Sequence, residues 1–224
     1  MKNLIQSIRA RQLRHFAFER GAVLGRVVER LAKGRAPRVH SLLWSDAVYG
    51  WDNEEWSADE LYLAEVVRSA ELSTGSILEC GSGLTTLLMG VVAARRGLQL
   101  HALEHNEKWH ARVSQALRDF GATTTTEHLA PLREYGDFDW YGAPLESMPN
   151  DFTLVVCDGP PASTRGGRSG MLPTMRSKLA PSCCVLLDDA NRPAEQELVR
   201  SWSKAGRGTT QINKSHRGFA RVAL

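Results

Sequence analysis

A short segment that joins an acidic residue to a glycine turn has the residue types and spacing of a ligand-binding loop. Residues 76–86 (SILECGSGLTT) predict an apolar strand ending at Glu79, a tight turn through Gly81 and Gly83, and a helix that begins near Thr85. Glycines let a backbone turn sharply and approach a ligand closely, and the start of a helix presents free N–H groups. A carboxylate before the turn repels a phosphate but attracts a cationic amine.

The ligand-binding residues predicted in this segment are Glu79, Gly81, Ser82, Gly83 and Thr85. We expect Gly81→Val to fill the space that the ligand needs while leaving the ligand-free fold intact. The same order of strand, glycine turn and helix also occurs in αβ connections that bind nothing. A second feature is therefore needed to choose between the two interpretations.

A second acidic residue supplies that feature. Residues 98–104 predict the next strand, which ends at Glu104, about 20 residues past the glycines. A carboxylate at this place can accept two hydrogen bonds from the diol of a ribose. His105 follows, and we expect it either beside an adenine ring or at the start of the next helix. The two segments together favour a ligand that has both a ribose and a cationic amine.

Three aspartates end two further apolar strands. Residues 151–158 lead to Asp158, and residues 182–188 lead to Asp188 and Asp189. Parallel strands place their carboxyl ends along one edge of a sheet, so these acids should converge there. A cation, a proton or hydrogen-bond donors must then offset their repulsion, and oxygen ligands suit Mg²⁺ or Ca²⁺. We predict Asp158 and Asp188 as catalytic residues, Asp158 also as a cofactor contact, and all three as metal ligands. The alternative for each is a turn former or a helix N-cap.

Arginines and tryptophans near these strand ends offer contacts for a substrate. Arg165 and Arg168 follow the first of the two strands, and Arg192 follows the second. A guanidinium group pairs with a carboxylate or phosphate in bidentate fashion. The predicted substrate residues are Arg165, Arg192 and Trp51, the last from an aromatic-rich segment over 42–56. The alternative for the arginines is a solvated loop.

The rest of the pattern supplies elements that place these residues on one edge of a sheet. Helices alternate with short apolar strands, which indicates a mostly parallel sheet covered on both faces. A capping sequence at Ser57, with Glu60 three residues later, predicts a helix that runs to about Leu72. Further helices are predicted over 85–96 and 107–120, a strand over 123–128, and an antiparallel hairpin over 209–215 and 218–224.

Charge is unevenly distributed along the 224 residues. The net charge is +3, but residues 1–38 hold ten Lys and Arg against two Glu, and the rest holds 18 basic and 23 acidic residues. Apolar residues recur at helical spacing in the basic part, with interruptions expected at Gly21 and Gly25. We predict a basic amphipathic extension over 1–40 and a single α/β domain over 41–224. The extension packs on the domain or on a second subunit, lies on an anionic membrane surface, or contacts nucleic acid.

Composition predicts a cytoplasmic protein. The four cysteines lack the spacing of a zinc site, and buried reduced thiols are expected. No apolar run has the length of a transmembrane helix, and the N-terminus has no secretory pattern.

Taken in order, these motifs resemble the class I S-adenosylmethionine-dependent methyltransferases, and in detail a bacterial O-methyltransferase-like subgroup. The motifs that carry the resemblance are 79–83 (ECGSG), 103–105 (LEH), 130–132 (APL) with the Trp-Tyr pair at 140–141, 158–161 (DGPP) and 188–192 (DDANR). The resemblance implies a Rossmann-like, seven-stranded sheet with one reversed edge strand, and S-adenosylmethionine as cofactor with Leu132 among its contacts. It also implies methylation of a hydroxyl on a small molecule or glycan. Relatives of catechol O-methyltransferase bind a divalent metal at these strand ends, but the Asp-Asn pair typical of that enzyme is missing here, which leaves Mg²⁺ open.

Three alternatives come from other classes of protein. A nicotinamide-dependent oxidoreductase would share the strand, glycine turn and ribose acid, but it would need a third glycine and no leading carboxylate. A nucleic-acid methyltransferase would need an aromatic residue after the Pro-Pro turn to stack a flipped base, and Ala162 stands there. A non-catalytic domain that binds S-adenosylmethionine is the third.

Overall fold

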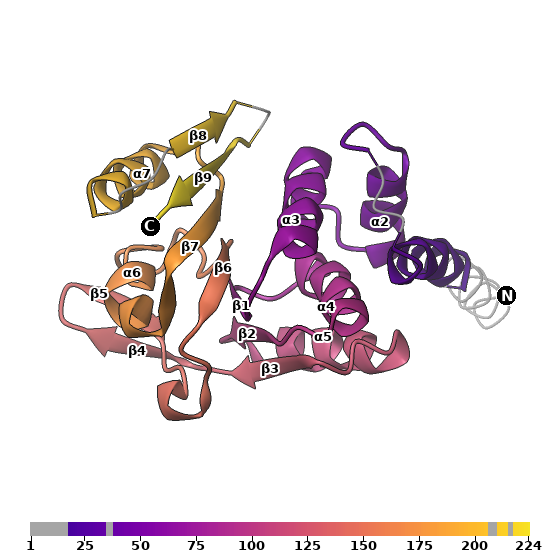
Figure 1. The fold of residues 1–224 in the computed structure, drawn as a ribbon, viewed down its shortest axis with the longest axis horizontal. Coiled ribbons are helices and arrows are strands. Elements are labelled where there is room, and N and C mark those ends of the chain that lie inside the picture. Colours follow the sequence, from indigo (N-terminus) through magenta and orange to yellow (C-terminus); the bar gives the residue numbers. More distant parts are fainter. Residues whose placement is uncertain (1–17, 35–37, 206–209, 215–216) are drawn as a thin grey trace, which may run out of the picture.

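A seven-stranded sheet forms the centre of the molecule. The computed structural model describes residues 18–34, 38–205, 210–214 and 217–224, and the strand order is β3-β2-β1-β6-β7-β9-β8. The strands are β1 (Ile77–Cys80), β2 (Leu100–Glu104), β3 (Thr125–Leu129), β6 (Phe152–Cys157), β7 (Leu179–Asp188), β8 (Thr210–Asn213) and β9 (Phe219–Ala223). The first five in spatial order are parallel, whereas β9 pairs antiparallel with β7 and with β8. The predicted mostly parallel sheet with a C-terminal antiparallel hairpin is confirmed (Figure 1).

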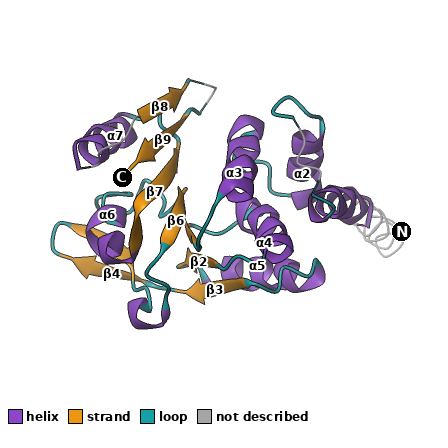
Figure 2. Cartoon of the chain, in the orientation of Figure 1, coloured by secondary structure: helices purple, strands orange, loops and turns teal. Residues whose placement is uncertain are grey.

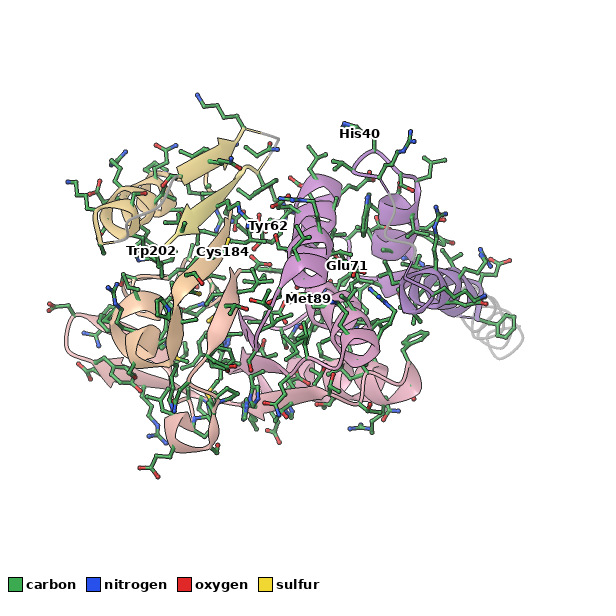
Figure 3. All side chains as sticks on the ribbon, in the orientation of Figure 1. His40, Tyr62, Glu71, Met89, Cys184 and Trp202 are labelled. Carbon is green, nitrogen blue, oxygen red and sulfur yellow. The ribbon has the colours of Figure 1, made fainter. Side chains whose placement is uncertain are left out.

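Both faces of the sheet are covered (Figures 1 and 2). On one face lie α2 (Leu43–Trp51), α3 (Glu60–Leu72), α4 (Leu84–Arg96) and α5 (Glu107–Asp119); on the other lie α6 (Met171–Met175), α7 (Pro193–Ala205) and the hairpin of β4 (Leu132–Tyr135) and β5 (Phe138–Tyr141). Successive side chains of a strand point to opposite faces, so Ile77 joins the first hydrophobic core and Leu78 the second. Figure 3 shows Tyr62 of α3 and Trp202 of α7 on opposite sides of β7.

The helix over 18–32 is part of the first core, and its glycines do not interrupt it. Leu24, Val27, Val28 and Leu31 are buried against the other helices of that face. A Cβ added to Gly50 would lie 2.8 Å from Cβ of Leu24, so the small residue of α2 lets the two helices approach closely. A glycine inside a helix costs only about 1 kcal/mol, and the burial of the four apolar residues of this helix offsets the cost of Gly21 and Gly25. Residues 1–17 of the expected extension lie outside the described part of the chain.

Helix α3 begins later than its capping sequence predicted. The N-cap is Asp59, whose Oδ1 accepts a hydrogen bond of 2.8 Å from the backbone N–H of Tyr62. The hydroxyl of Ser57 instead donates to the carbonyl of Asn53. A carboxylate is as good an N-cap as a hydroxyl, and the preceding turn uses Ser57.

Other element boundaries differ from the sequence-based expectation in small ways. Strand β7 begins at Leu179 rather than at 182, and β3 lies over Thr125–Leu129 rather than 123–128. The β4–β5 hairpin was not predicted, because its polar and aromatic residues lack a clear two-residue alternation. The C-terminal hairpin is present, but residues 215–216 at its tip and residue 209 fall outside the described residues.

All four cysteines are free thiols; Cys80, Cys157 and Cys183 are buried as predicted, whereas Cys184 is only half-buried. Among the helices in the described part of the chain, none combines the length and the apolar character that crossing a bilayer requires.

Candidate functional site

A cleft of about 1240 Å³ opens at the carboxyl ends of the central strands. Its walls come from the turns after β1, β2, β6 and β7 and from the connection between α2 and α3. The predicted residues that line it are Trp51, Gly81, Ser82, Gly83, Thr85, Glu104, His105, Asp158, Asp189 and Arg192. The fold therefore brings most of the candidate site together from strand ends far apart in the sequence.

The two glycines of the first turn have different surroundings. Gly81 has φ +90, and a Cβ there would lie 2.7 Å from the backbone N of Gly159. Gly83 has extended backbone at φ 176, and among the described residues beyond its chain neighbours an added Cβ would come within 4 Å only of Cζ2 of Trp109, at 4.0 Å. Gly81 is thus required by the neighbouring chain, whereas Gly83 faces the cleft. The expectation that Gly81→Val leaves the ligand-free fold intact is wrong, because the side chain would collide with backbone.

Glu79 lies beneath the turn and is completely buried. Thr85 donates its hydroxyl hydrogen bond to Oε1 at 2.5 Å, while Oε2 has no hydrogen-bond partner among the described residues. Burial raises the pKa of this carboxyl to about 8, although its hydrogen bonds to Thr85 and Thr86 oppose the shift. Glu79 is not among the residues that line the cleft. Thr85, in the first turn of α4, holds this carboxyl below the glycine turn.

Glu104 ends β2 and is held in place by the glycine turn and the chain that follows. Its Oε2 accepts hydrogen bonds from the backbone N–H and the hydroxyl of Ser82, at 3.2 and 3.3 Å, and its Oε1 accepts one of 2.7 Å from the N–H of Asn106. Nδ1 of His105 lies 3.1 Å from Oε1. Trp109 closes this side, since its indole N–H donates to the carbonyl of Ser82 at 2.6 Å. The carboxylate is therefore oriented before any ligand binds.

The three aspartates at the ends of β6 and β7 surround an arginine. Their carboxylate oxygens approach within 4.8 Å of one another. Arg168 donates through Nη2 to Oδ1 of Asp158 at 3.1 Å and to Oδ2 of Asp189 at 2.9 Å, and through Nη1 to the carbonyl of Asp188 at 2.6 Å. Arg168 is only 3% exposed. The predicted convergence of the acids is confirmed, and the cation among them is a guanidinium.

Asp158 and Asp188 differ in exposure, and burial raises the pKa of both. Burial raises the pKa of Asp188 well above its usual value, and the charges of Asp158 and Asp189 add to this shift. Burial also raises the pKa of Asp158, while the guanidinium of Arg168 opposes it. Asp158 lines the cleft, but Asp188 does not and is fully buried. The Oδ1 of Asp188 accepts a hydrogen bond from the N–H of Asp189, whose φ of 56 makes it the turn residue.

Aromatic and cationic residues form the mouth of the cleft. Trp51 and Trp109 meet edge to face with ring centroids 6.1 Å apart, and the guanidinium of Arg112 lies about 5 Å from each ring. Trp56 is 70% exposed. Arg192 lies 2.9 Å from Asp189, and 47% of its side chain remains exposed. The mouth thus combines flat apolar surface with positive charge.

Two predicted residues are placed away from the cleft. Leu132 belongs to β4 and packs against the second core. Arg165 is on the outer surface of its loop, paired with Asp139 at 2.6 Å and Glu134 at 3.1 Å. Neither is among the residues that line the cleft.

Some contacts of the site were not predicted. Trp109, Arg112 and Tyr141 line the cleft, and the Trp-Tyr pair at 140–141 had been noted only as part of the resemblance. Arg165 and Arg168 lie in the same glycine-containing loop, and nothing in their residue type showed that Arg168 turns inward while Arg165 stays outside.

Comparisons with known proteins agree with this geometry. A family model described as "Methyltransferase domain" matches residues 78–190, which is half of the chain. No curated protein matches.

Solved structures share the fold at low sequence identity. A putative caffeoyl-CoA O-methyltransferase from Staphylococcus aureus has a TM-score of 0.58 at 12% identity, covering 89% of this chain and 98% of that one. A methyltransferase from Podospora anserina, solved with SAH bound, has a TM-score of 0.57 at 15% identity, covering 83% and 87%. An O-methyltransferase of tomaymycin synthesis from Streptomyces achromogenes, in complex with SAM, has a TM-score of 0.51 at 18% identity, covering 81% and 86%.

The matched residues begin inside β1 and end just after β7, so they include the glycine turn, Glu104 and the aspartate cluster. The chain belongs to the class I S-adenosylmethionine-dependent methyltransferases.

Proposed function

We propose that this protein transfers a methyl group from S-adenosylmethionine to a hydroxyl group of a small molecule or glycan. The observation that carries the proposal is one cleft that holds the glycine turn, Glu104 and Asp158. The cofactor, when bound, supplies an activated methyl group on a sulfonium centre. The protein then has to align a nucleophilic oxygen with that carbon and accept the departing proton.

The residues of the cleft fit this cofactor. Glu104 offers preoriented carboxylate oxygens for a ribose diol. Gly83 leaves open space where a side chain would otherwise stand. The hydroxyl of Tyr141 is buried, lines the cleft and has no hydrogen-bond partner among the described residues. Glu79 does not line the cleft, but it has one unpartnered oxygen beneath the turn, and a cationic amine bound above the turn would favour its charged form.

Asp158 is the proposed proton acceptor. It lies on the cleft wall at the end of β6, and Arg168 holds its Oδ1 in a fixed orientation. A raised pKa makes a carboxylate a stronger base than an ordinary aspartate, and burial raises the pKa of Asp158. Asp188, buried behind it, orients the turn through Asp189 rather than meeting the acceptor.

The mouth of the cleft supports an acceptor with a flat ring and a negative group. The exposed face of Trp56 suits stacking of an aromatic or sugar ring. Arg192 retains exposed guanidinium surface beside Asp189, and such a group pairs with a carboxylate or phosphate.

The test begins with calorimetry of S-adenosylmethionine binding. Glu104→Ala should weaken binding by about 1–3 kcal/mol through the lost charge-assisted hydrogen bonds. Arg165→Ala, on the outer surface, should leave binding unchanged. The protein is then assayed for release of S-adenosylhomocysteine with catechols, phenolic acids, sugar acids and RNA as acceptors.

Asp158→Asn should abolish turnover of a hydroxyl acceptor while retaining cofactor affinity. Turnover of RNA alone would replace the proposal with nucleic-acid methylation. Cofactor binding without turnover of any acceptor in a broad panel would favour a non-catalytic domain.

A further inference from the structure

We propose that Arg168 is the resident cation of the aspartate cluster and that it excludes a divalent metal from this site. The cluster comprises Asp158, Asp188 and Asp189, which the sequence predicted as metal ligands. The inference concerns the site of the proposed function and rests on it only for the consequence that methyl transfer needs no Mg²⁺.

The guanidinium occupies the place that a metal ion would need. Nη2 of Arg168 already donates to one carboxylate oxygen of each of two neighbours, Oδ1 of Asp158 at 3.1 Å and Oδ2 of Asp189 at 2.9 Å. The same nitrogen also donates to the carbonyl oxygen of Asp158, and Nη1 donates to that of Asp188. Mg²⁺ requires near-octahedral oxygen ligands at about 2.0–2.1 Å, which these donors prevent while they remain in place.

The loop that carries Arg168 is closely packed, so the side chain has no easy way out. A Cβ added to Gly166 would lie 2.5 Å from Cβ of Phe138, and one added to Gly170 would lie 2.8 Å from the ring of Trp140. The loop therefore rests directly on β5. Arg168 itself is 3% exposed, and displacing it would remove a buried charge partner from Asp158 and Asp189, which is costly.

The charges of the cluster are also nearly balanced. Arg168 pairs with Asp158 and Asp189, and Arg192 pairs with Asp189 at 2.9 Å. With every carboxylate ionised, the three acids and two guanidinium groups leave one net negative charge. A dication would add to positive charge already in contact with the same oxygens, and this repulsion opposes its binding.

The test measures metal binding, which needs no methyl acceptor. Failure of this inference can therefore be told apart from failure of the proposed function. Protein treated with EDTA and dialysed is titrated with Mg²⁺ in a thermal shift assay and with Mn²⁺ in electron paramagnetic resonance. The wild type should show no Mg²⁺-specific stabilisation and no bound Mn²⁺. Arg168→Met, which retains much of the side-chain length without charge or donors, should bind about one Mn²⁺ per chain and gain stability with Mg²⁺. Binding should be lost again in Arg168→Met/Asp189→Asn.

Matched variants separate the charge from general loosening of the loop. Arg165→Met, three residues earlier and paired outside the cleft, should bind no Mn²⁺, and Arg168→Lys should also stay free of metal because it retains a cation. Mn²⁺ bound to the wild type and lost in Asp189→Asn would overturn the proposal, as would a folded Arg168→Met that binds none. If Arg168→Met does not fold, the wild-type titration with its Asp189→Asn control still decides whether the cluster takes a metal.

Discussion

Gly81 and Gly83 stand two residues apart in one turn, but the structure places different demands on them. The neighbouring backbone of Gly159 and a positive φ require a glycine at 81, whereas the cleft itself lies beside 83. Glu79, below the same turn, is completely buried and has an oxygen with no hydrogen-bond partner among the described residues. At the scale of single residues, the site is therefore a mixture of groups that hold the chain and groups that face the ligand.

Gly83→Val should abolish S-adenosylmethionine binding and retain the fold, because its side chain enters the cleft without meeting protein atoms closer than the neighbouring Trp109. Calorimetry should show affinity reduced by more than tenfold, about 1.4 kcal/mol, with an unchanged circular dichroism spectrum. Gly81→Ala, in contrast, should lower the melting temperature. Wild-type affinity in Gly83→Val would show that the cofactor does not use this turn.

Glu79 makes the stability of the cofactor-free protein depend on pH. Burial raises its pKa to about 8, above the value of about 4.3 expected in the unfolded chain. The folded state then retains a proton that the unfolded state releases, so this group costs stability progressively as pH rises between these two values. Glu79→Gln removes the titration and should flatten the decline in unfolding free energy, by at most about 1.4 kcal/mol per pH unit. If the unfolding free energies of the wild type and of Glu79→Gln, measured in urea, changed with pH in the same way, the raised pKa of Glu79 would be contradicted.

At the scale of elements, the ends of helices and strands decide where the functional side chains lie. Helix α4 begins at the glycine turn, and α5 begins at Asn106, whose side chain accepts a hydrogen bond from the N–H of Trp109. That cap sets the first turn of α5 and so brings the indole over Ser82. The connection into α3 likewise brings Trp56 to the mouth of the cleft.

Asp59→Ala should lower the unfolding free energy by about 0.5–2 kcal/mol, since it removes the N-cap of α3. Ser57→Ala is the matched control, because its hydroxyl bonds the preceding turn and not the helix. Denaturant unfolding compares the two. A larger loss of unfolding free energy in Ser57→Ala than in Asp59→Ala would mean that Ser57, as the sequence predicted, is the N-cap of α3.

At the scale of the whole molecule, the basic N-terminal segment divides into two parts. Residues 18–32 form a helix packed into the first core, which was one of the alternatives expected for the segment. Contact of residues 1–38 with an anionic membrane or a second subunit stays a prediction, and liposome flotation of the full chain tests it. The domain boundary near residue 40 also stays a prediction. The buried residues of this helix argue against it, because they pack into the same core as the rest of the domain.

Leu31→Ala should destabilise the protein by about 2–5 kcal/mol, because Leu31 is fully buried in the first core. Leu42→Ala, at a leucine that is 82% exposed, should change stability by less than about 0.5 kcal/mol. Chemical unfolding gives both values. Equal and small effects would mean that the N-terminal helix is a separable extension after all.

Local pattern alone was enough to predict the alternating strands and helices, the C-terminal hairpin, and the acids at four strand ends, whereas the strand reversed relative to the sheet was implied by the family resemblance. These features depend on short-range chemistry: buried strands are continuously apolar, and glycine punctuates the turns that follow them. Parallel strands then bring their carboxyl ends to one edge, which is why Glu104 and Asp158 could be expected in one site.

Tertiary structure decided what each of these residues meets. Residue type does not reveal which of two loop arginines turns inward, and only packing of the loop against β5 places Arg168 among the aspartates while Arg165 stays outside. Similarly, the sequence shows an acid before the glycines, but only the fold buries Glu79 beneath them and raises its pKa. Burial and charge pairing arise from contacts between distant segments, so the sequence determined the positions of the acids along the sheet edge, and the tertiary structure determined their charge partners.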